Sequence, residues 1–288
     1  MANLKVIRRR IKTARNISQI TKAMEMVAAS KMRRAQIQAL ASRPYAGKIY
    51  ETIAYLGAKI KKENHPLLQK REIKKKAVVV ISPDKGLCGG LNTNLFRSLR
   101  RLTGEEFSRI QFITVGKKAR DYILRNRGTL LAEFTGFSRG LTSSDVQPIV
   151  KLLADGFREG QFDQVSLYYM HFENTLSQKP TALNLLPIVG LETPAGLKTT
   201  PADYLLEPGA EAIFEWLLPY YLEMILYQSI LEALASEQSA RMVAMKNATD
   251  NVADIVFELN LNYNKVRQQI ITNEIAEIAS VSTASAEN

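Results

Sequence analysis

Cysteine is almost absent from this sequence of 288 residues, because Cys88 is its single example. One cysteine excludes a disulfide within the chain and leaves no thiolate cluster for a metal, which fits a reducing compartment. Long apolar runs are absent as well, since none approaches the roughly 18 residues that a helix needs to cross a bilayer. We therefore expect any association with a membrane to depend on partner proteins.

Proline and glycine are missing from both ends of the sequence, with none before Pro44 and none after Pro219. Near the start, apolar residues recur at spacings of three and four, which predicts one face of a helix of about 40 residues. These residues are Leu4, Ile7, Ile11, Ala14, Ile17, Ile20, Met24 and Val27. A similar stripe after Pro219 predicts a second helix, and a continuous helix through most of that segment would be about 90 Å long.

A helix of that length does not fit inside a compact domain of this size, whose radius of gyration would be about 19 Å. We expect it to project and to pair with the N-terminal helix as an antiparallel coiled coil. Charge favours this pairing: residues 1–43 carry eleven basic side chains and one acid, whereas residues 203–288 carry thirteen acids and four bases. Small residues and methionines at 23–35 and 233–248 would allow close helix approach. Because the lengths differ, isoleucines near the C-terminal end lack a partner in the chain, which indicates a protein partner.

Between the two helices, apolar strands alternate with amphipathic helices. We predict strands at 75–82, 110–116, 164–172 and 174–188, and helices at 91–102, 117–126 and 143–160. This alternation is typical of a doubly wound α/β domain. The predicted fold class is thus α/β: a long antiparallel two-helix coiled coil formed by the N- and C-terminal helices, plus a small doubly wound α/β domain. We divide the chain into an N-terminal coiled-coil helix and linker (1–75), a Rossmann-like domain (76–205) and a C-terminal coiled-coil helix (206–288).

The turn after the first strand, DKGLCGG at residues 84–90, is rich in glycine and could suggest a phosphate site. It matches neither the dinucleotide fingerprint nor the phosphate loop, and Leu91 and Asn92 stand where a lysine and a hydroxyl residue would be needed. A tight strand-to-helix turn is favoured. Cys88 has no histidine near it in the sequence, so an inert small residue is favoured over a reactive thiol.

Histidine is scarce too, and neither His65 nor His171 has partners at the spacing of a metal site or a catalytic triad. We predict no catalytic, cofactor-binding or metal-ligating residues, and no cofactor. Residues 1–40 are basic but contain no aromatic side chain, which disfavours binding to nucleic acid. Two alternatives stay open: a nucleotide-binding α/β enzyme with a coiled-coil arm, and a basic coiled-coil adaptor for nucleic acid.

Three stretches together resemble the gamma subunit family of F-type ATP synthases. They are ITKAMEMVAASKMRRAQ at 20–36, DKGLCGGLNTNLF at 84–96 and ASEQSARMVAMKNATDN at 235–251, the last followed by YNKVRQQIITNEIAEI at 263–278. The resemblance implies a central-stalk rotor subunit that is not catalytic alone. Such a subunit couples proton-driven rotation of the c ring to ATP synthesis in the ring of alpha and beta subunits, and regulates ATPase activity and proton flow.

The same resemblance implies three sets of contact residues. Contacts with the stator loops of the catalytic ring carry over onto Lys22, Ala23, Met24, Arg241, Arg267, Gln268 and Thr272. Contacts with the epsilon subunit and the c ring carry over onto Tyr204 and Glu207. An apolar bearing at the top of the ring would use Ile270, Ile271, Ile275 and Ile278.

The implied partners are three alpha and three beta subunits, the epsilon subunit and the c ring, with no nucleic acid. The basic N-terminal stretch shows no change of composition typical of a removable targeting segment, so we expect a bacterial protein. Its expected place is peripheral, on the cytoplasmic face of the inner membrane, and bound only through its partners.

Overall fold

The computed structural model describes residues 2–59, 65–137, 140–188 and 207–286. Two helices account for both ends of the chain, α1 (Ala2–Lys59) and α5 (Ala210–Ala286). The chain divides into two compact units, which are described separately below. The sheet unit is Ala29–Arg241, and the coil unit combines Met1–Ala28 with Met242–Asn288.

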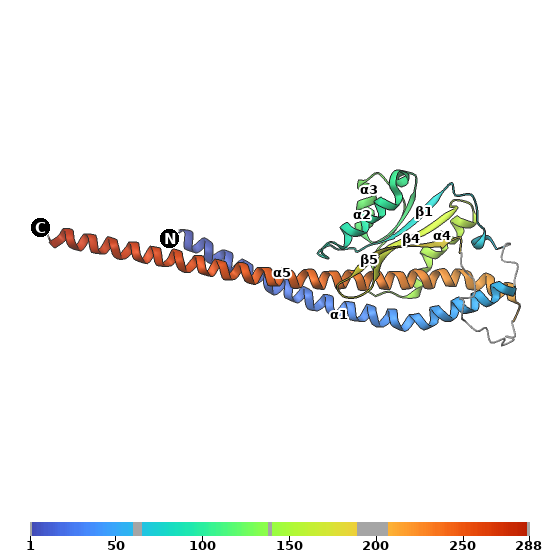
Figure 1. Cartoon of the computed structure of the whole chain (residues 1–288), viewed down its shortest axis with the longest axis horizontal. Coiled ribbons are helices and arrows are strands. Elements are labelled where there is room, and N and C mark those ends of the chain that lie inside the picture. Colours follow the sequence, from blue (N-terminus) through green and yellow to red (C-terminus); the bar gives the residue numbers. More distant parts are fainter. Residues whose placement is uncertain (1, 60–64, 138–139, 189–206, 287–288) are drawn as a thin grey trace. The chain divides into compact units, whose positions relative to one another are not determined.

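The sheet unit contains a five-stranded sheet in the order β3-β2-β1-β4-β5 (Figure 1). Its strands are β1 (Lys76–Ile81), β2 (Gln111–Val115), β3 (Thr129–Phe134), β4 (Gln164–Phe172) and β5 (Gln178–Leu186). The first four strands run parallel, with Val79 opposite both Ile113 of β2 and Leu167 of β4. Strand β5 pairs antiparallel with β4 and forms an edge.

Helices cover both faces of this sheet, as expected for a doubly wound fold. Helices α2 (Leu91–Thr103) and α3 (Lys117–Arg125) pack on one face, whereas α4 (Gln147–Arg158), α1 and α5 pack on the other (Figure 1). Short 3₁₀ helices fully within the described residues are η2 (Pro66–Leu68), η3 (Gly104–Ser108) and η5 (Ser143–Asp145). Alternate residues of β1 enter opposite cores, Val79 on the α5 face and Val80 on the α2 face.

Helix α1 is longer than the sequence predicts, because it continues through Pro44 to Lys59. The extra turns carry Ile49, Ile53 and Leu56, which are buried in the core beneath the sheet. Burial of these side chains offsets the hydrogen bond that the proline cannot donate. Helix α5 likewise begins at Ala210 and passes through Pro219.

In the coil unit, α1 and α5 run antiparallel (Figure 1). Their buried and half-buried residues include a seam that repeats every 3.5 residues. The seam positions on α1, all buried or half-buried, are Leu4, Ile7, Ile11, Ala14, Ser18, Thr21, Glu25 and Ala28. Those on α5 are Met242, Met245, Thr249, Val252, Val256, Leu259, Tyr263, Val266 and Ile270. Each list follows steps of three and four in alternation, which is the pattern of a left-handed coiled coil.

The predicted apolar stripe on α1 is wrong at Ile17, Ile20 and Val27, which are 44%, 59% and 55% exposed, whereas Met24 of the stripe is half-buried. From Ile11 to Ile20 the predicted stripe advances by three steps of three residues, which is one residue less than the seam advances from Ile11 to Thr21. One residue corresponds to about 100° around a helix, so the stripe turns away from the partner helix. The seam continues instead through small or polar residues.

The expected charge pairing between the two helices is limited: the ion pairs of α1, Lys22 with Glu25 and Lys48 with Glu51, lie within that helix. Between the helices, burial raises the pKa of Glu237 on α5, and the charge of Lys31 on α1 opposes that rise. Basic residues of α1 such as Arg8, Arg9 and Lys12 are exposed outside the seam. Exposed charges like these are screened by salt. Apolar burial rather than ion pairing therefore holds the two helices of the coil unit together.

Candidate functional site

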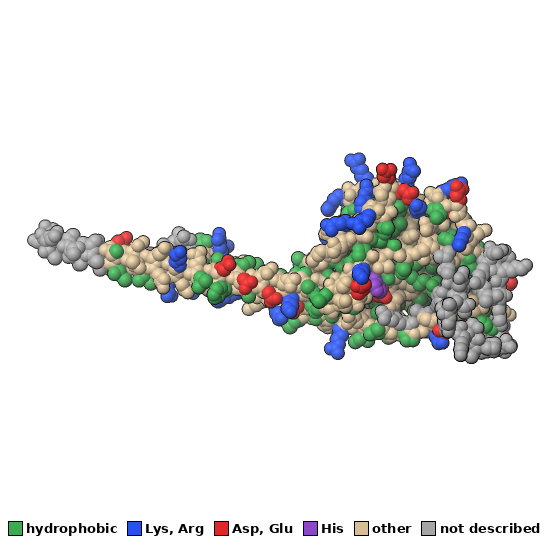
Figure 2. Space-filling view, viewed as in Figure 1, with side chains coloured by type: hydrophobic (Ala, Val, Ile, Leu, Met, Phe, Trp, Pro, Cys, Tyr) green, Lys and Arg blue, Asp and Glu red, His purple; other side chains and the backbone are tan. Residues whose placement is uncertain are grey.

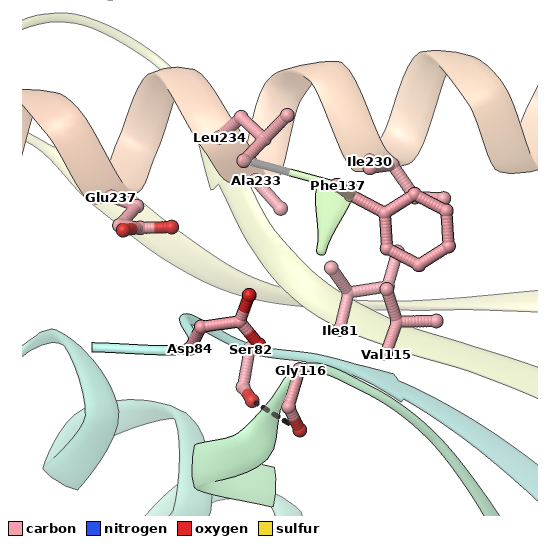
Figure 3. Close-up of a pocket in the computed structure, with 10 residues that line it drawn as sticks. All are labelled: Ile81, Ser82, Asp84, Val115, Gly116, Phe137, Ile230, Ala233, Leu234 and Glu237. Carbon is pink, nitrogen blue, oxygen red and sulfur yellow. Dashed lines mark hydrogen bonds between the residues drawn. The ribbon is translucent and has the colours of Figure 1, made fainter. Parts of the chain in front are cut away.

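The carboxyl edge of the parallel sheet is where an α/β domain of this type would bind a ligand. Here α5 lies across it (Figure 3). The ends of β1 and β2, represented by Ile81 and Val115, face Ile230, Ala233 and Leu234 of α5. The cavity left between them has a volume of about 20 Å³, room for about one water molecule. This crevice therefore has no space for a nucleotide.

The glycine-rich turn presents the wrong groups for a phosphate. Arg241 of α5 donates to the carbonyl oxygens of Lys85 and Gly86, over 3.3 and 3.1 Å. A phosphate loop offers backbone N–H groups at this point, whereas the present turn offers carbonyl oxygens that bind a cation. The turn itself needs left-handed backbone, with φ values of 61° at Leu87 and 57° at Gly89.

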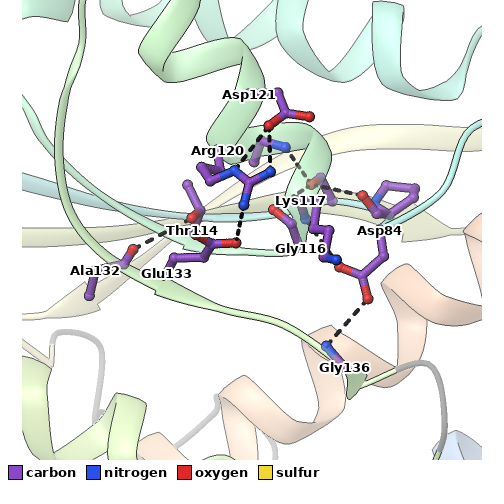
Figure 4. Close-up of polar contacts among 12 residues, drawn as sticks. Asp84, Thr114, Gly116, Lys117, Arg120, Asp121, Ala132, Glu133 and Gly136 are labelled. Carbon is purple, nitrogen blue, oxygen red and sulfur yellow. Dashed lines mark hydrogen bonds and ion pairs between the residues drawn. The ribbon is translucent and has the colours of Figure 1, made fainter.

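At the same edge, side chains of the chain itself cap the N-terminus of α3 (Figure 4). The Asp84 carboxylate accepts hydrogen bonds from the backbone N–H of Lys117 and of Gly136, at 3.1 and 3.3 Å. The Ser82 hydroxyl accepts from the N–H of Ala119 at 2.7 Å. Gly116 is required beside them, because a Cβ there would lie 1.9 Å from the Ser82 carbonyl oxygen. These amides are satisfied internally and do not await an anion.

A buried ion pair joins Arg241 to Glu237, with 2.7 Å between Nη1 and Oε1. Burial raises the pKa of Glu237, and the charge and hydrogen bond of Arg241 oppose that rise. Cys88 in the nearby turn is 2% exposed, and burial raises the pKa of its thiol. A buried protonated thiol is a poor nucleophile, which favours the interpretation of Cys88 as an inert residue.

Both histidines have partners within the chain. The Nδ1 atom of His65 accepts from the backbone N–H of Leu67 at 3.2 Å, and burial lowers the pKa of this histidine. The Nδ1 atom of His171 lies 2.7 Å from Oε2 of Glu232. In the part of the chain that the structure describes, no three His, Cys, Asp or Glu side chains come together as metal ligands would.

Comparisons of the sequence and of the fold with known proteins point to the same family. The family model described as ATP synthase matches residues 3–286. A protein of Dehalococcoides mccartyi called ATP synthase gamma chain is 46% identical over 280 residues, which cover 96% of this chain and 97% of the relative. One of the same name from Roseiflexus castenholzii is 43% identical over the whole of both chains. The chain belongs to the ATP synthase gamma chain family.

Solved structures of ATP synthases contain chains that are similar to this one. In the structure of the central stalk and c ring of the Tetrahymena thermophila mitochondrial ATP synthase, the matching chain is 29% identical. It has a TM-score of 0.62, and the match covers 80% of this chain and 99% of that one. A Euglena gracilis mitochondrial ATP synthase chain is 21% identical with a TM-score of 0.70, over 98% of this chain and 94% of that one, and shows the shared fold.

The stator contacts expected for a gamma chain lie mostly on exposed surface of the coil unit. Lys22 and Ala23 are exposed, and Met24 is half-buried. Arg267, Gln268 and Thr272 are exposed. Arg241 differs, because it is 8% exposed and its guanidinium binds groups of its own chain. The stator contacts of all these residues stay predictions.

The expected apolar bearing lies where α5 leaves its partner helix. Ile270 is half-buried in the seam, whereas Ile271 and Ile275 are 46% and 61% exposed. Every side chain from residue 271 to 277 is exposed. Tyr204 and the side chain of Ile278 lie outside the described residues, and Glu207 is exposed.

Sequence reasoning missed further apolar side chains on the surface of the coil unit (Figure 2). Phe257 and Leu261 are 65% and 56% exposed, and they are four residues apart on one face of α5. Their spacing could have revealed them, because neither fits the seam. In the sheet unit Trp216 is 68% exposed and stacks on Tyr220 with ring centres 5.5 Å apart.

Proposed function

We propose that this chain is the rotating central shaft of a bacterial F-type ATP synthase, which couples rotation of the c ring to ATP synthesis in the alpha and beta subunits. As a gamma chain it is a subunit of that complex and is not catalytic alone, since the catalytic sites lie in the beta subunits. A rigid shaft makes ATPase activity and proton flow depend on each other. The proposed role therefore includes regulation of both.

The observation that carries the proposal is the exposed apolar end of α5. Ile271 and Ile275 are 46% and 61% exposed there, four residues apart on one face of the helix. Apolar side chains that share one exposed face of a helix favour a partner that surrounds it. Apolar contacts lack directional bonds, so a helix held by them can turn in its sleeve.

Two further surfaces complete the proposal. Arg267, Gln268 and Thr272, with Lys22, Ala23 and Met24, would meet the loops of the catalytic ring. Tyr204 and Glu207 would meet the epsilon subunit and the c ring. In this scheme 76–205 is the foot domain, and 1–75 with 206–288 supply the shaft.

No helix among the described residues is long and apolar enough to cross a bilayer. We place the chain on the cytoplasmic face of the inner membrane, held there by the c ring and the epsilon subunit. The alternative of a nucleotide-binding enzyme is disfavoured by the filled crevice at the sheet edge, which leaves about 20 Å³.

The decisive experiment is co-purification from the native membrane with an affinity tag on this chain. We expect alpha and beta subunits in a ratio of three to three to one copy of this chain, together with the epsilon subunit and the c ring. Recovery of the tagged chain without alpha and beta subunits would refute the proposal. Titration of the isolated chain with ATP separates the enzyme alternative, because we expect no saturable binding.

A further inference from the structure

Four polar side chains of α5, Glu232, Ser236, Ser239 and Arg241, form one set of contacts with the sheet and its turns, here named the polar key. Three of them, Ser236, Ser239 and Arg241, lie in the stretch of small residues at 233–248 that we expected to serve close packing between the two long helices. The structure instead directs them to the sheet unit. They span roughly 13 Å of helix at 1.5 Å per residue.

The two serines donate hydrogen bonds to backbone carbonyl groups outside their own helix. Ser236 Oγ lies 2.9 Å from the Met170 carbonyl oxygen of β4, and Ser239 Oγ lies 2.7 Å from that of Thr175 in the turn before β5. A serine in a helix can donate its hydroxyl hydrogen to a carbonyl oxygen of the preceding turn of the same helix. These two serines instead donate to carbonyl oxygens outside α5. Both serines are 0% exposed, and a partner protein cannot reach them.

The ends of the polar key are charged. At one end, Oε2 of Glu232 receives the Tyr169 hydroxyl at 3.1 Å and lies 2.7 Å from Nδ1 of His171. At the other end, Arg241 binds Glu237 and two carbonyl oxygens of the turn between β1 and α2. The key thus touches β4, the β4–β5 turn and the β1–α2 turn, three separate parts of the sheet unit.

Contacts of this kind resist motions that apolar packing permits. The neighbouring contacts of Ile230, Ala233 and Leu234 with the sheet are apolar and lack a preferred direction. A hydrogen bond weakens steeply when its angle changes. Several such bonds to fixed carbonyl groups therefore oppose both rolling of α5 about its axis and sliding along it.

We propose that the polar key fixes the rotational register of α5 on the sheet, so that torque applied to the sheet unit passes into the shaft without slip. The inference rests on the proposed function, because it assigns these residues a role in a rotor. They are positioning residues, because they act through their contacts with the sheet and its turns. Arg241 holds this role through contacts within its own chain.

The test uses the complete ATP synthase carrying the Ser236→Ala, Ser239→Ala double variant. This variant removes two hydroxyl groups that no partner reaches, so it leaves the predicted stator contact of Arg241 intact. The matched control is Leu231→Val, at a core position of α5 that is 0% exposed and has no directional contact. Thermal unfolding of both variants verifies that they lose comparable stability.

The readout is the torsional stiffness of the rotor, measured from the angular fluctuations of a bead on the sheet unit while the catalytic ring is fixed. We expect at least a twofold loss of stiffness in the serine variant, a further loss when Arg241→Met is added, and wild-type stiffness in Leu231→Val. Equal stiffness in all variants, or an equal loss in the control, would overturn the inference. Failure of the serine variant to co-purify with alpha and beta subunits would also overturn it, because the hydroxyls would then serve assembly. Failure of the wild type to co-purify would instead refute the proposed function.

Discussion

The hydroxyl oxygens of Thr21 and Thr249 lie 2.7 Å apart across the seam of the coil unit, although 228 positions separate them in the sequence. Each hydroxyl also approaches a carbonyl of its own helix, that of Ser18 at 3.1 Å for Thr21 and that of Met245 at 2.9 Å for Thr249. One hydroxyl therefore donates across the seam and the other within its helix. A polar pair at one seam position can fix the register of a coiled coil.

A double-mutant cycle on this pair measures that interaction. We expect Thr21→Val and Thr249→Val to show a coupling free energy of about 0.5–1.5 kcal/mol in chemical unfolding of the full chain. The double variant should be near neutral, because two methyl groups of the same shape replace two hydroxyls. Additive effects of the two single substitutions would contradict the hydrogen bond across the seam.

The strands of the sheet were predictable where they are buried on both faces. The near-continuous apolar runs of β1 and β2 identified these strands, and the predicted strand at 164–172 coincides with β4. Strand β3 was missed because its residues alternate between exposed and half-buried at the sheet edge, with a glutamate, Glu133, among them. An edge strand buries too little to produce an apolar run.

On α1, the predicted stripe follows the seam only up to Ala14. Beyond it, choosing the most apolar positions favoured Ile17 and Ile20, whereas the geometry of paired helices selects Ser18 and Thr21. Partner orientation is a property of both helices, so one helix's pattern does not determine it. For the same reason the polar key escaped notice: whether Ser236 faces a helix or a sheet depends on the tertiary fold.

Proline at Ala248 should break the shaft. This residue is half-buried in the coil unit, inside α5. Ala248→Pro removes an interior hydrogen bond and places the ring against the preceding turn, which costs roughly 3 kcal/mol or more. We expect ATP-driven proton pumping in reconstituted vesicles to fall well below that of the wild type at equal ATPase activity.

The matched control for that kink is Ala248→Ser, which keeps the backbone N–H and costs about 0.5 kcal/mol of helix propensity. It should pump protons as the wild type does. Normal coupling in the proline variant would count against a shaft that transmits torque through an unbroken α5.

The exposed end of α5 should matter only when the catalytic ring is present. Ile271→Ser with Ile275→Ser removes two exposed apolar side chains, so the stability of the isolated chain should change by less than about 0.5 kcal/mol. Burial of each isoleucine in a partner contributes about 1.5–3 kcal/mol, and we therefore expect at least tenfold weaker binding to isolated alpha–beta rings. Asn273→Ser, an exposed polar position between them, is the control. Unchanged affinity of the double isoleucine variant would disprove the bearing.

The buried carboxyl of Glu223 makes the stability of the fold depend on pH. The groups around this carboxyl determine whether stability rises or falls with pH. It is 7% exposed on α5, and burial raises its pKa, while hydrogen bonds from Gln147 and Ser143 oppose the rise. A glutamate whose pKa is higher in the folded state stabilises the fold when protonated, and this contribution is lost as the pH rises through the folded-state pKa.

Glu223→Gln keeps the shape of this side chain without its charge. We therefore expect the variant to melt at a higher temperature than the wild type at pH 8, and the difference to shrink as the pH falls toward the ordinary glutamate value of about 4.3. Melting curves of both chains between pH 4 and pH 8 measure the difference. Glu211→Gln, an exposed position at the start of the same helix, should show no such gain at pH 8. A Glu223→Gln chain that is less stable than the wild type at pH 8 would show that the ionised carboxylate is stabilised by partners stronger than its burial penalty.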